Sequence, residues 1–362
     1  MAITLNRKDL GRVVDRTDIL TEVPYTMDIT EALGLFGEYY STQKTVEIVK
    51  HSRNQQILTD SNWDGRGQTM ANESERQFLQ VSIPHIKAED AIYPHDIDGV
   101  VAINDSVEIM NLAQVADIRA EKMFILKDAH ELTKTAARFQ LLKDGSVYAP
   151  NKTLRTSYGD TVNFYNEFGI TRKSIAMDFG NTVDPRIQSR QVLADYRKDL
   201  RGTQGTLRGV VALCGAEFFT KVITNPYITE MVSRVALPGN QSLATLLGVN
   251  QDDPRFAGFD ARFPSISVFG ITYVDVGVAG YDVGDSFVPF VADDEAIMIP
   301  VGLTNVAKTY YAPANRFSAV NKKSQGSYWF EKASDEKIQI MSEQNFMHGL
   351  LAPQAIQTLT LA

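Results

Sequence analysis

The stretch SVEIMNLAQVADIRAEKMFILKDAHELTKTAARFQLL, residues 106–142, decides the fold, because none of its 37 residues is Gly or Pro. Apolar side chains recur in it at steps of three and four, which predicts a helix with one apolar face. These positions are Ile109, Leu112, Ala116, Ala120, Met123, Leu126, Ala129, Leu132, Ala136 and Phe139. At 1.5 Å per residue the helix would be about 55 Å long, so it would extend beyond any single core.

Residues on either side of this stretch support one continuous helix. Asp105 followed by Glu108 resembles a capping box, and Gly145 is a natural left-handed stop. The alternative is two ordinary helices that meet at a bend near residues 127–128.

Two strand-like runs precede the helix, at residues 45–50 and 77–83. Both are rich in β-branched and aromatic residues and partly alternate between apolar and polar. The residues between them are almost all polar, and such a long connection is uncommon inside a compact domain. The pattern predicts a long hairpin that projects from the core. Since a two-stranded hairpin is marginally stable alone, we expect a substrate or a neighbouring subunit to lie against it.

The rest of the chain predicts an α+β fold. Asp184 and Pro185 indicate the start of a helix that ends before Gly202. We expect strands at residues 209–215, 265–276, 288–300, 339–341 and 357–361, a helix at residues 218–234 broken at 225–226, and a hairpin within residues 146–164. The first forty residues predict either an extended arm or an ordinary N-terminal strand, and the sequence leaves both open.

The composition is that of an ordinary globular chain. Its 362 residues are 44% hydrophobic and 22% charged, which excludes a disordered chain and suggests about two domains. With 36 basic and 44 acidic side chains the net charge is −8, so no basic excess is present for binding phosphates. One Cys excludes a disulfide framework. No apolar run could span a bilayer and no signal peptide is evident, so we expect a soluble intracellular chain.

Patterns for catalysis and for cofactor or metal binding are weak. Cys214 ends an apolar strand, where a lone Cys is expected to be a buried structural residue. The nearest approach to a metal site lacks the helical spacing of ligands, and Pro84 and Pro94 indicate turns in this segment, so its side chains are expected on solvated loops; they are His85, Glu89, His95, Asp96 and Asp98.

Two further patterns are better explained as ordinary structural features than as functional sites. The acidic run at residues 293–295 is typical of a solvated turn. The Gly-containing run at 201–205 ends a helix, whereas a phosphate loop opens one. We therefore predict no enzyme activity, no catalytic residue, no cofactor and no metal.

Five stretches in order make the chain resemble the lambda-like major capsid protein E family of tailed bacteriophages. They are LGLF at 33–36; IPHI at 83–86 with EDAI at 89–92 and DIDGV at 96–100; NEFGI at 166–170; ALCGAEFF at 212–219; and TYYAPA at 309–314. Each is short, but together they span the chain from about residue 30 to its end.

The resemblance implies the HK97-type capsid fold, an α+β fold with five parts. These would be an N-terminal arm at residues 1–44, an extended loop (E-loop) at 45–92, a peripheral domain at 93–180 with a spine helix at 106–142, an axial domain at 181–304, and a return to the peripheral domain at 305–362. The hairpin predicted above would be the extended loop.

The same resemblance implies self-assembly. Copies would form homo-hexamers and homo-pentamers of an icosahedral shell around packaged double-stranded DNA, bound without sequence specificity. Each copy would lay its extended loop on a neighbour's spine helix. The expected partners are the chain itself, a decoration protein, a separate scaffolding protein and a portal, with no membrane, and the chain would reside in the virion after assembly in the host bacterial cytoplasm.

The extended loop departs from one pattern of this fold. Some such shells join subunits through a lysine on the loop and an asparagine elsewhere, but no lysine lies between Lys50 and Lys87 here. We therefore expect stabilisation by non-covalent contacts and a decoration protein.

Four charged loop residues, Asp64, Arg66, Glu73 and Arg76, are candidates for salt bridges between subunits, the alternative being solvated surface charges. For the whole chain, the other functions that remain open are a tail-tube or other structural phage protein and an enzyme with the hairpin as a lid.

Overall fold

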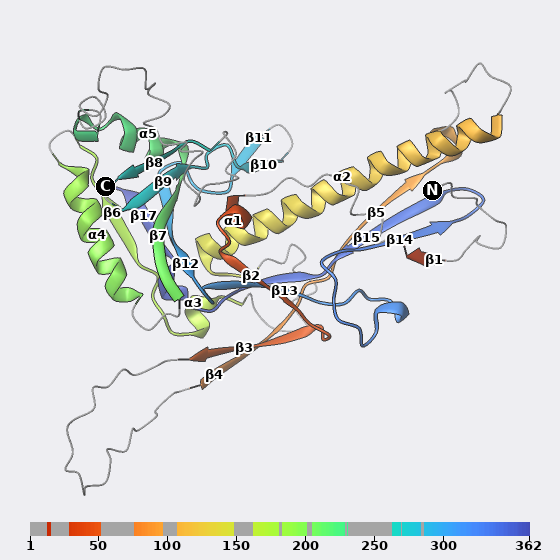
Figure 1. Ribbon diagram of the computed structural model, residues 1–362, viewed down its shortest axis with the longest axis horizontal. Coiled ribbons are helices and arrows are strands. Elements are labelled where there is room, and N and C mark those ends of the chain that lie inside the picture. Colours follow the sequence, from red (N-terminus) through yellow and green to blue (C-terminus); the bar gives the residue numbers. More distant parts are fainter. Residues whose placement is uncertain are drawn as a thin grey trace, which may run out of the picture.

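Two sheet-bearing units, linked by one long helix, make up the computed structural model (Figure 1). It describes residues 13–15, 29–51, 76–96, 107–147, 162–180, 183–200, 205–228, 230, 263–268, 270–283 and 286–362. Residues 97–106, which include Asp105 of the expected capping box, lie outside these residues, as do most of the predicted hairpin within 146–164 and the chain from 231 to 262.

The long helix, α2, runs without interruption from Val107 to Asp144, which confirms one continuous helix rather than two. Its 38 residues correspond to about 57 Å. The helix stops at Gly145, whose backbone has φ +67°. A Cβ at this position would collide with the ring of Tyr165, so glycine is required both for the turn and for the close approach of that ring.

A four-stranded antiparallel sheet lies along α2. Its order is β1 (Val13–Asp15), β14 (Tyr328–Ala333), β15 (Ile338–Gln344) and β5 (Ile86–Ile92). A small apolar cluster lies between the helix and this sheet, formed by Ile92, Met123, Leu126, Trp329 and Ile340. A 3₁₀ turn, η3 (Pro94–Asp96), follows β5.

A three-stranded sheet connects the two units. It contains β2 (Phe36–Tyr40), β13 (Ala307–Tyr311) and β16 (Phe346–Leu350), with β2 parallel to β13. The short helix α1 (Ile29–Ala32) precedes β2. The N-terminal segment thus contributes strands to two sheets, at residues 13–15 and 36–40.

The second unit is built on a six-stranded mixed sheet. The order is β6 (Ser174–Met177), β17 (Gln357–Leu361), β12 (Glu295–Leu303), β7 (Gly205–Cys214), β9 (Ile271–Asp275) and β8 (Ser265–Val268). Helix α4 (Pro185–Asp199) and helix α5 (Ala216–Thr224) pack on it, and Asp184 caps α4 as predicted. The remaining elements are α3 (Phe164–Glu167), η5 (Phe317–Ala319), η6 (Pro353–Ala355) and a hairpin of β10 (Gly280–Val283) and β11 (Ser286–Pro289).

One apolar core joins the six-stranded sheet to the end of α2. It contains Leu213 and Val274 from the sheet together with Phe139, Leu141 and Leu142 from the helix. The ring of Phe139 stacks on Phe290 at 4.9 Å between centroids. The C-terminal half of the helix is therefore fixed to the second unit, whereas the N-terminal half lies along the four-stranded sheet.

Two sequence predictions need correction, and a third is confirmed. Residues 265–276 form two antiparallel strands, because Gly270 at φ +90° reverses the chain between them. Residues 288–300 are likewise interrupted: β11 ends at Pro289, and a turn at 293–294 precedes β12. The expected helix at 218–234 is confirmed as far as it is described: α5 ends at Thr224, the chain breaks at Asn225, and helical residues resume at 226–228. The Asn225 side chain accepts a hydrogen bond from the N–H of Tyr227 just after the break.

Gly215 offers a test of the packing between β7 and α5. A Cβ at this position would lie 2.6 Å from the Cα of Asp293 and closer still to the carbonyl oxygen of Ala292. We expect Gly215→Ala to lower the free energy of unfolding by about 1–3 kcal/mol or more, since backbone atoms must shift. Gly326→Ala is the matched control, because nothing lies within 4 Å of its Cβ. Equal urea midpoints for the two variants would contradict this account.

Candidate assembly surfaces

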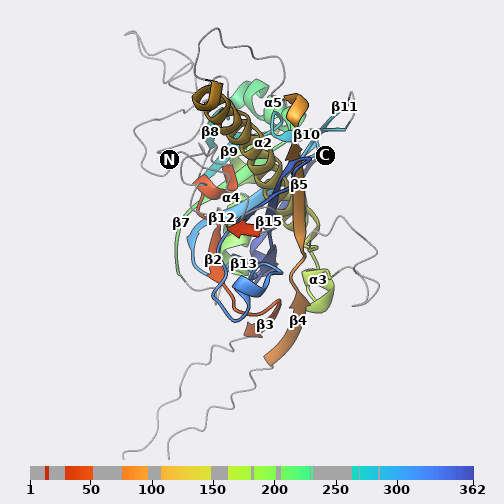
Figure 2. The same ribbon diagram turned by 90° about the vertical axis from the view of Figure 1, so that its right-hand side faces the viewer.

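The hairpin of β3 (Thr45–His51) and β4 (Arg76–Ser82) projects from the lower end of the molecule, below β2 and β13 (Figures 1 and 2). Its strands pair antiparallel from Thr45 opposite Ser82 to His51 opposite Arg76, which confirms the predicted hairpin. The polar connection at residues 52–75 lies outside the described residues.

The base of this hairpin is firmly anchored. Four apolar side chains of the hairpin are buried in the main core: Val46, Ile48, Val81 and Ile83. Glu47 and Gln80, which lie opposite each other on the two strands, are exposed. This alternation places one face of the hairpin against the protein. At Gly349 on β16, a Cβ would lie 3.0 Å from the Cδ1 of Ile48, so the missing side chain makes room for the hairpin. A projection on a fixed base is suited to reach a neighbouring molecule in a defined direction.

The face of α2 that contacts the sheets carries buried charges and an imidazole. Arg119 donates to Glu331 on β14 at 2.8 Å, and both side chains are 8% exposed. Further along the same face, Lys122 pairs with Asp90 on β5 at 3.2 Å, and His130 Nε2 contacts the hydroxyl of Ser342 on β15 at 2.8 Å. Because these partners come from three strands, they fix the register of the helix on the sheet.

The opposite face of α2 exposes large apolar side chains. Phe124, Ile125 and Leu132 are 46%, 55% and 43% exposed. The predicted apolar stripe is therefore only partly buried: Met123, Leu126 and Phe139 face inward, whereas Ala120, Ala129 and Leu132 are exposed. The physical reason is that the sheet supplies carboxylates and hydroxyls to a row of basic residues, so that row turns inward. The helix is left with an apolar outer surface typical of an interaction site.

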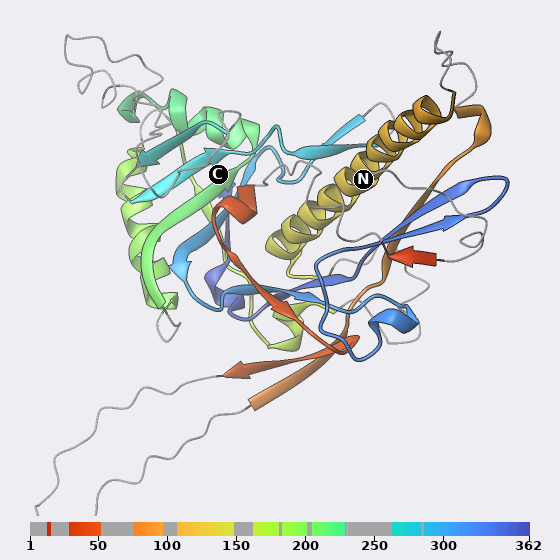
Figure 3. The ribbon, with the colours of Figure 1, turned by 45° about the vertical axis from the view of Figure 1, so that its right-hand side comes forward.

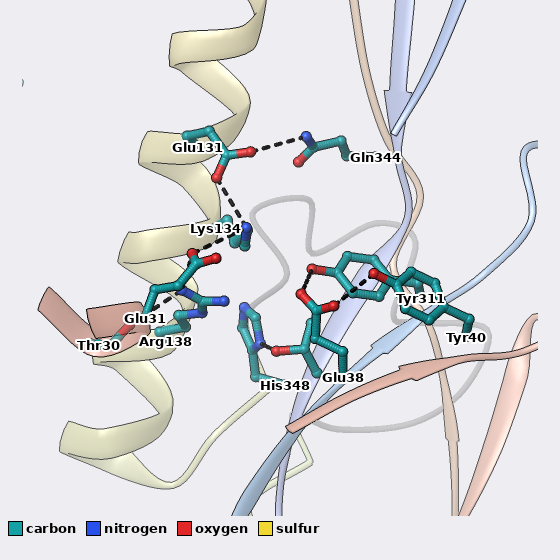
Figure 4. Close-up of polar contacts among 11 residues, drawn as sticks. Thr30, Glu31, Glu38, Tyr40, Glu131, Lys134, Arg138, Tyr311, Gln344 and His348 are labelled. Carbon is teal, nitrogen blue, oxygen red and sulfur yellow. Dashed lines mark hydrogen bonds and ion pairs between the residues drawn. The ribbon is translucent and has the colours of Figure 1, made fainter. Parts of the chain in front are cut away.

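A buried polar cluster ties α1 to α2 (Figure 4). Arg138 of α2 donates to the Glu31 carboxylate of α1 at 3.2 Å, and Lys134 lies 3.7 Å from the same carboxylate. Lys134 also pairs with Glu131 at 3.0 Å, and Glu131 accepts from Gln344 at 3.5 Å. Lys134 is 7% exposed and Arg138 is 2% exposed, so these carboxylates neutralise charges that water hardly reaches.

On the far side of this cluster, a second polar group links β2, β13 and β16 (Figure 4). Tyr40 donates to Glu38 at 2.7 Å and Tyr311 donates to it at 3.4 Å, while His348 Nδ1 contacts the hydroxyl of Thr309 at 3.0 Å. Burial lowers the pKa of His348 well below its usual value, and nearby Arg138 and Lys134 act in the same direction, so its imidazole is neutral. Thr309 and His348 are both buried, so this hydroxyl and imidazole are closed to a substrate and the arrangement serves to hold strands together.

Of the four charged loop residues proposed from the sequence, only Arg76 lies within the described residues. Asp64, Arg66 and Glu73 lie outside the described residues, and Arg76 begins β4 opposite His51. Their role between subunits stays a prediction.

The side chains closest to a metal-site pattern have other partners. His85 contacts Asn345 at 2.8 Å, Glu89 binds Lys87 and accepts from Gln339, and Asp96 accepts from the N–H of Tyr93. Asp98 lies outside the described residues. Among the residues that are described, no three His, Cys, Asp or Glu side chains are grouped to hold a metal ion.

Cys214 is a structural residue. It is fully buried in β7, its thiol donates to the carbonyl of Ala212 at 3.3 Å, and burial raises the pKa of the thiol well above its usual value. Such a thiol stays protonated and unreactive.

A hollow of about 460 Å³ lies beside α4 and β6. Its charged groups are already paired: Lys173 lies 2.6 Å from Asp199, and Lys198 lies 2.7 Å from Asp195. The pKa of Asp195 is lowered by its hydrogen bond from Lys198. No acid or base in this hollow is held ready for proton transfer. Within the described part of the chain, no helix is both long and apolar enough to cross a membrane.

Sequence reasoning missed the basic row of α2, which does the most to hold the helix in place. The signal was present, since His130, Lys134 and Arg138 recur at intervals of four residues and therefore share one helical face. The sequence does not reveal that a sheet with matching acceptors lies opposite.

The proteins that this chain resembles in sequence are phage capsid proteins. The family model described as phage major capsid protein E matches residues 13–361. The major capsid protein of Pseudomonas phage KPP10 is 29% identical over 347 residues, covering 94% of each chain.

Solved structures agree in fold. The putative capsid protein of an E. coli CFT073 prophage aligns with a TM-score of 0.51 at 10% identity, covering 91% of this chain and 92% of that one. The capsid of Ralstonia phage GP4 gives a TM-score of 0.51 at 11% identity, covering 92% and 88%. These matches confirm the HK97-type fold that the sequence resemblance implied.

The buried pair Arg119–Glu331 generates a stability prediction. Arg119→Met removes the guanidinium that neutralises a buried carboxylate and should lower the free energy of unfolding by about 3–5 kcal/mol. Adding Glu331→Leu should recover most of that loss, measured as a double-mutant cycle in urea. The matched control, Lys198→Met, breaks an exposed pair and should change stability little. A loss at Arg119 no larger than at Lys198 would show that the pair is unimportant.

His130 generates a pH prediction. Burial lowers its pKa from 6.5 to about 4, so between these values the unfolded chain binds a proton that the folded chain does not. Stability is therefore expected to fall by up to about 3 kcal/mol as the pH drops from 6.5 to 4. Thermal unfolding of His130→Gln should depend less steeply on pH in this window. A slope for His130→Gln as steep as that of the wild type would contradict this account.

Proposed function

Because the chain belongs to the phage major capsid protein E family, we propose that the surfaces described above join its copies into a closed shell. The chain is the major capsid protein of a tailed phage, a structural component of the virion that forms the icosahedral shell. The family match over residues 13–361 carries this conclusion. It replaces the alternatives of an enzyme with a lid and of a tail-tube protein.

The hairpin β3–β4 of one copy lies on the outer face of α2 in a neighbouring copy. Two observations support this arrangement: the hairpin projects from an anchored base, and the outer face of α2 exposes Phe124, Ile125 and Leu132. Covering apolar surface of this kind contributes roughly 25 cal/mol per Å². Each copy thus both offers and receives a contact, which is the condition for closing a ring.

The proposed domains follow the sheets. The four-stranded sheet with α2 corresponds to the peripheral domain, and the six-stranded sheet with α4 and α5 corresponds to the axial domain at the capsomer centre. The C-terminal strand β17 lies in the six-stranded sheet, between β6 and β12, so the chain returns through the three-stranded sheet and ends in the axial unit. Residues 1–44 serve as the arm and 45–92 as the extended loop.

Hexamers and pentamers of this chain enclose packaged double-stranded DNA. Individual contacts need only be modest, because each added copy binds several neighbours at once. The net charge of −8 suits a container, since a wall that held phosphates tightly would hinder release of the genome. Maturation is an expansion in which the hairpin shifts and α2 flexes between two packings.

Other head proteins complete the assembly. With no lysine between Lys50 and Lys87, the extended loop has no lysine for a covalent crosslink, so a decoration protein stabilises the shell. A separate scaffolding protein guides assembly, and a portal occupies one vertex. On the loop itself, Asp64, Arg66, Glu73 and Arg76 form salt bridges between neighbouring copies.

Electron microscopy of particles made from the chain tests the role of the hairpin. The full chain, produced together with its scaffolding protein, should give closed shells. Replacing residues 52–75 by an Asn-Gly turn should leave a folded subunit that forms few or no shells, because the contact with the neighbour is lost. Circular dichroism of the unassembled variant checks its folding.

The alternatives give different images. Tubes from the full chain would indicate a tail-tube protein, and featureless small particles would contradict shell formation. Normal shells from the shortened chain would leave the shell function standing but exclude the hairpin contact.

Charge reversal tests the proposed salt bridges of the loop. Arg66→Glu or Arg76→Glu should lower the yield of particles, because each would place like charges across a subunit boundary. Lys221→Glu, at an exposed position on α5, is a control for the change in net charge. A yield equal to that of the control would favour solvated surface charges.

A further inference from the structure

The connection between β13 and β14 displays an apolar side chain to solvent. Phe317 is fully exposed at 101%, and Val320, one turn further on, is 59% exposed. Residues 312–330 also carry three cations, Arg316, Lys322 and Lys323, and no acid. We name residues 314–323 the basic turn. A fully exposed phenylalanine beside cations is unusual enough to indicate a binding surface.

The basic turn is rigid at its base. The Glu343 carboxylate, only 2% exposed, accepts from the N–H of Asn315 at 3.1 Å and from Arg316 at 3.2 Å. The Arg316 guanidinium lies over the ring of Phe330 at 4.7 Å, and Ala319 is buried beside that ring. A turn fixed in this way loses little conformational freedom when a partner covers Phe317.

The opposite charge gathers on another part of the chain. Residues 263–307 hold six acids and no Lys or Arg. Within them, the hairpin β10–β11, which we name the acidic hairpin, exposes Tyr281 at 39% and Phe287 at 50%. Asp282 is exposed and lies directly opposite Phe287 in the strand register, so a carboxylate and a phenyl ring share one face.

The two surfaces cannot meet within one molecule. The acidic hairpin lies above α2, and the short blue helix of the basic turn lies below it (Figures 1 and 3). Tyr281 packs on Phe290, which stacks on Phe139 of α2, whereas the basic turn is attached to β14 and β15.

From this complementarity we propose that the basic turn of one copy docks on the acidic hairpin of a second copy, with Phe317 against Phe287 and Lys322 and Lys323 facing Asp282. The contact is head to tail, because the two patches differ, and such contacts close into rings or continue through a shell. It rests on the proposed function in requiring assembled copies, and it is a contact separate from that of the hairpin β3–β4.

Chemical crosslinking in particles tests the contact. The full chain carrying Phe317→Cys and Phe287→Cys is assembled and treated with a short bis-maleimide. A ladder of covalent oligomers is expected on a denaturing gel. The native Cys214 gives little background because it is fully buried. The control pair, Phe317→Cys with Ile187→Cys, places the second thiol at an exposed site on α4 that belongs to neither surface.

Charge exchange provides a second, independent measurement. Lys322→Glu with Lys323→Glu should lower the yield of particles about tenfold, because acids would face Asp282. Adding Asp282→Lys to the same chain should restore most of the yield. All altered residues are exposed, so thermal unfolding of the unassembled chain should remain at the wild-type midpoint.

Crosslinking no stronger than in the control pair, or charge exchange without any recovery, would overturn this contact while normal wild-type shells left the proposed function intact. Absence of shells from the wild-type chain would instead count against the proposed function.

Discussion

The burial of basic side chains along one face of α2 is the constraint on which the rest of the structure depends. A 38-residue helix cannot be held by a small apolar cluster alone, and Arg119, His130 and Arg138 bind it at separate points along its length. Once these groups face inward, the exposed Phe124, Ile125 and Leu132 must face outward. The same interaction that attaches the helix to its own sheets therefore leaves exposed the surface that we propose as a contact with another copy.

Two segments project from the protein and are anchored at their bases. The hairpin β3–β4 has a buried base, and the basic turn is held by the carboxylate of Glu343. In each case the fixed part belongs to the core and the contact surface points away from it. A shell needs this combination, because a flexible projection would lose conformational entropy each time a neighbour was added, whereas a fixed one does not. Weak contacts repeated many times can then close a large assembly.

The structure contains buried titratable groups without catalytic use. Cys214, His130 and His348 are held in their neutral forms by burial, and the charged pairs beside α4 neutralise one another. Strong pKa shifts often mark active sites, yet here each has a structural cause. Family membership and these pairings give the same picture of a protein whose chemistry is packing and association.

The sequence by itself determined the long helix, the hairpin and the family, because each has a local signal. These signals are the run without Gly or Pro, the alternation of β-branched residues, and the five short motifs in order along the chain. Only the tertiary structure decided which face of α2 is buried, since helical periodicity identifies rows of residues but not the acceptors opposite them. It also decided the turns at Gly270 and after Pro289, where apolar runs conceal chain reversals, and the exposure of Phe317. Burial depends on contacts between distant segments, such as Glu343 with Arg316, that no local pattern encodes.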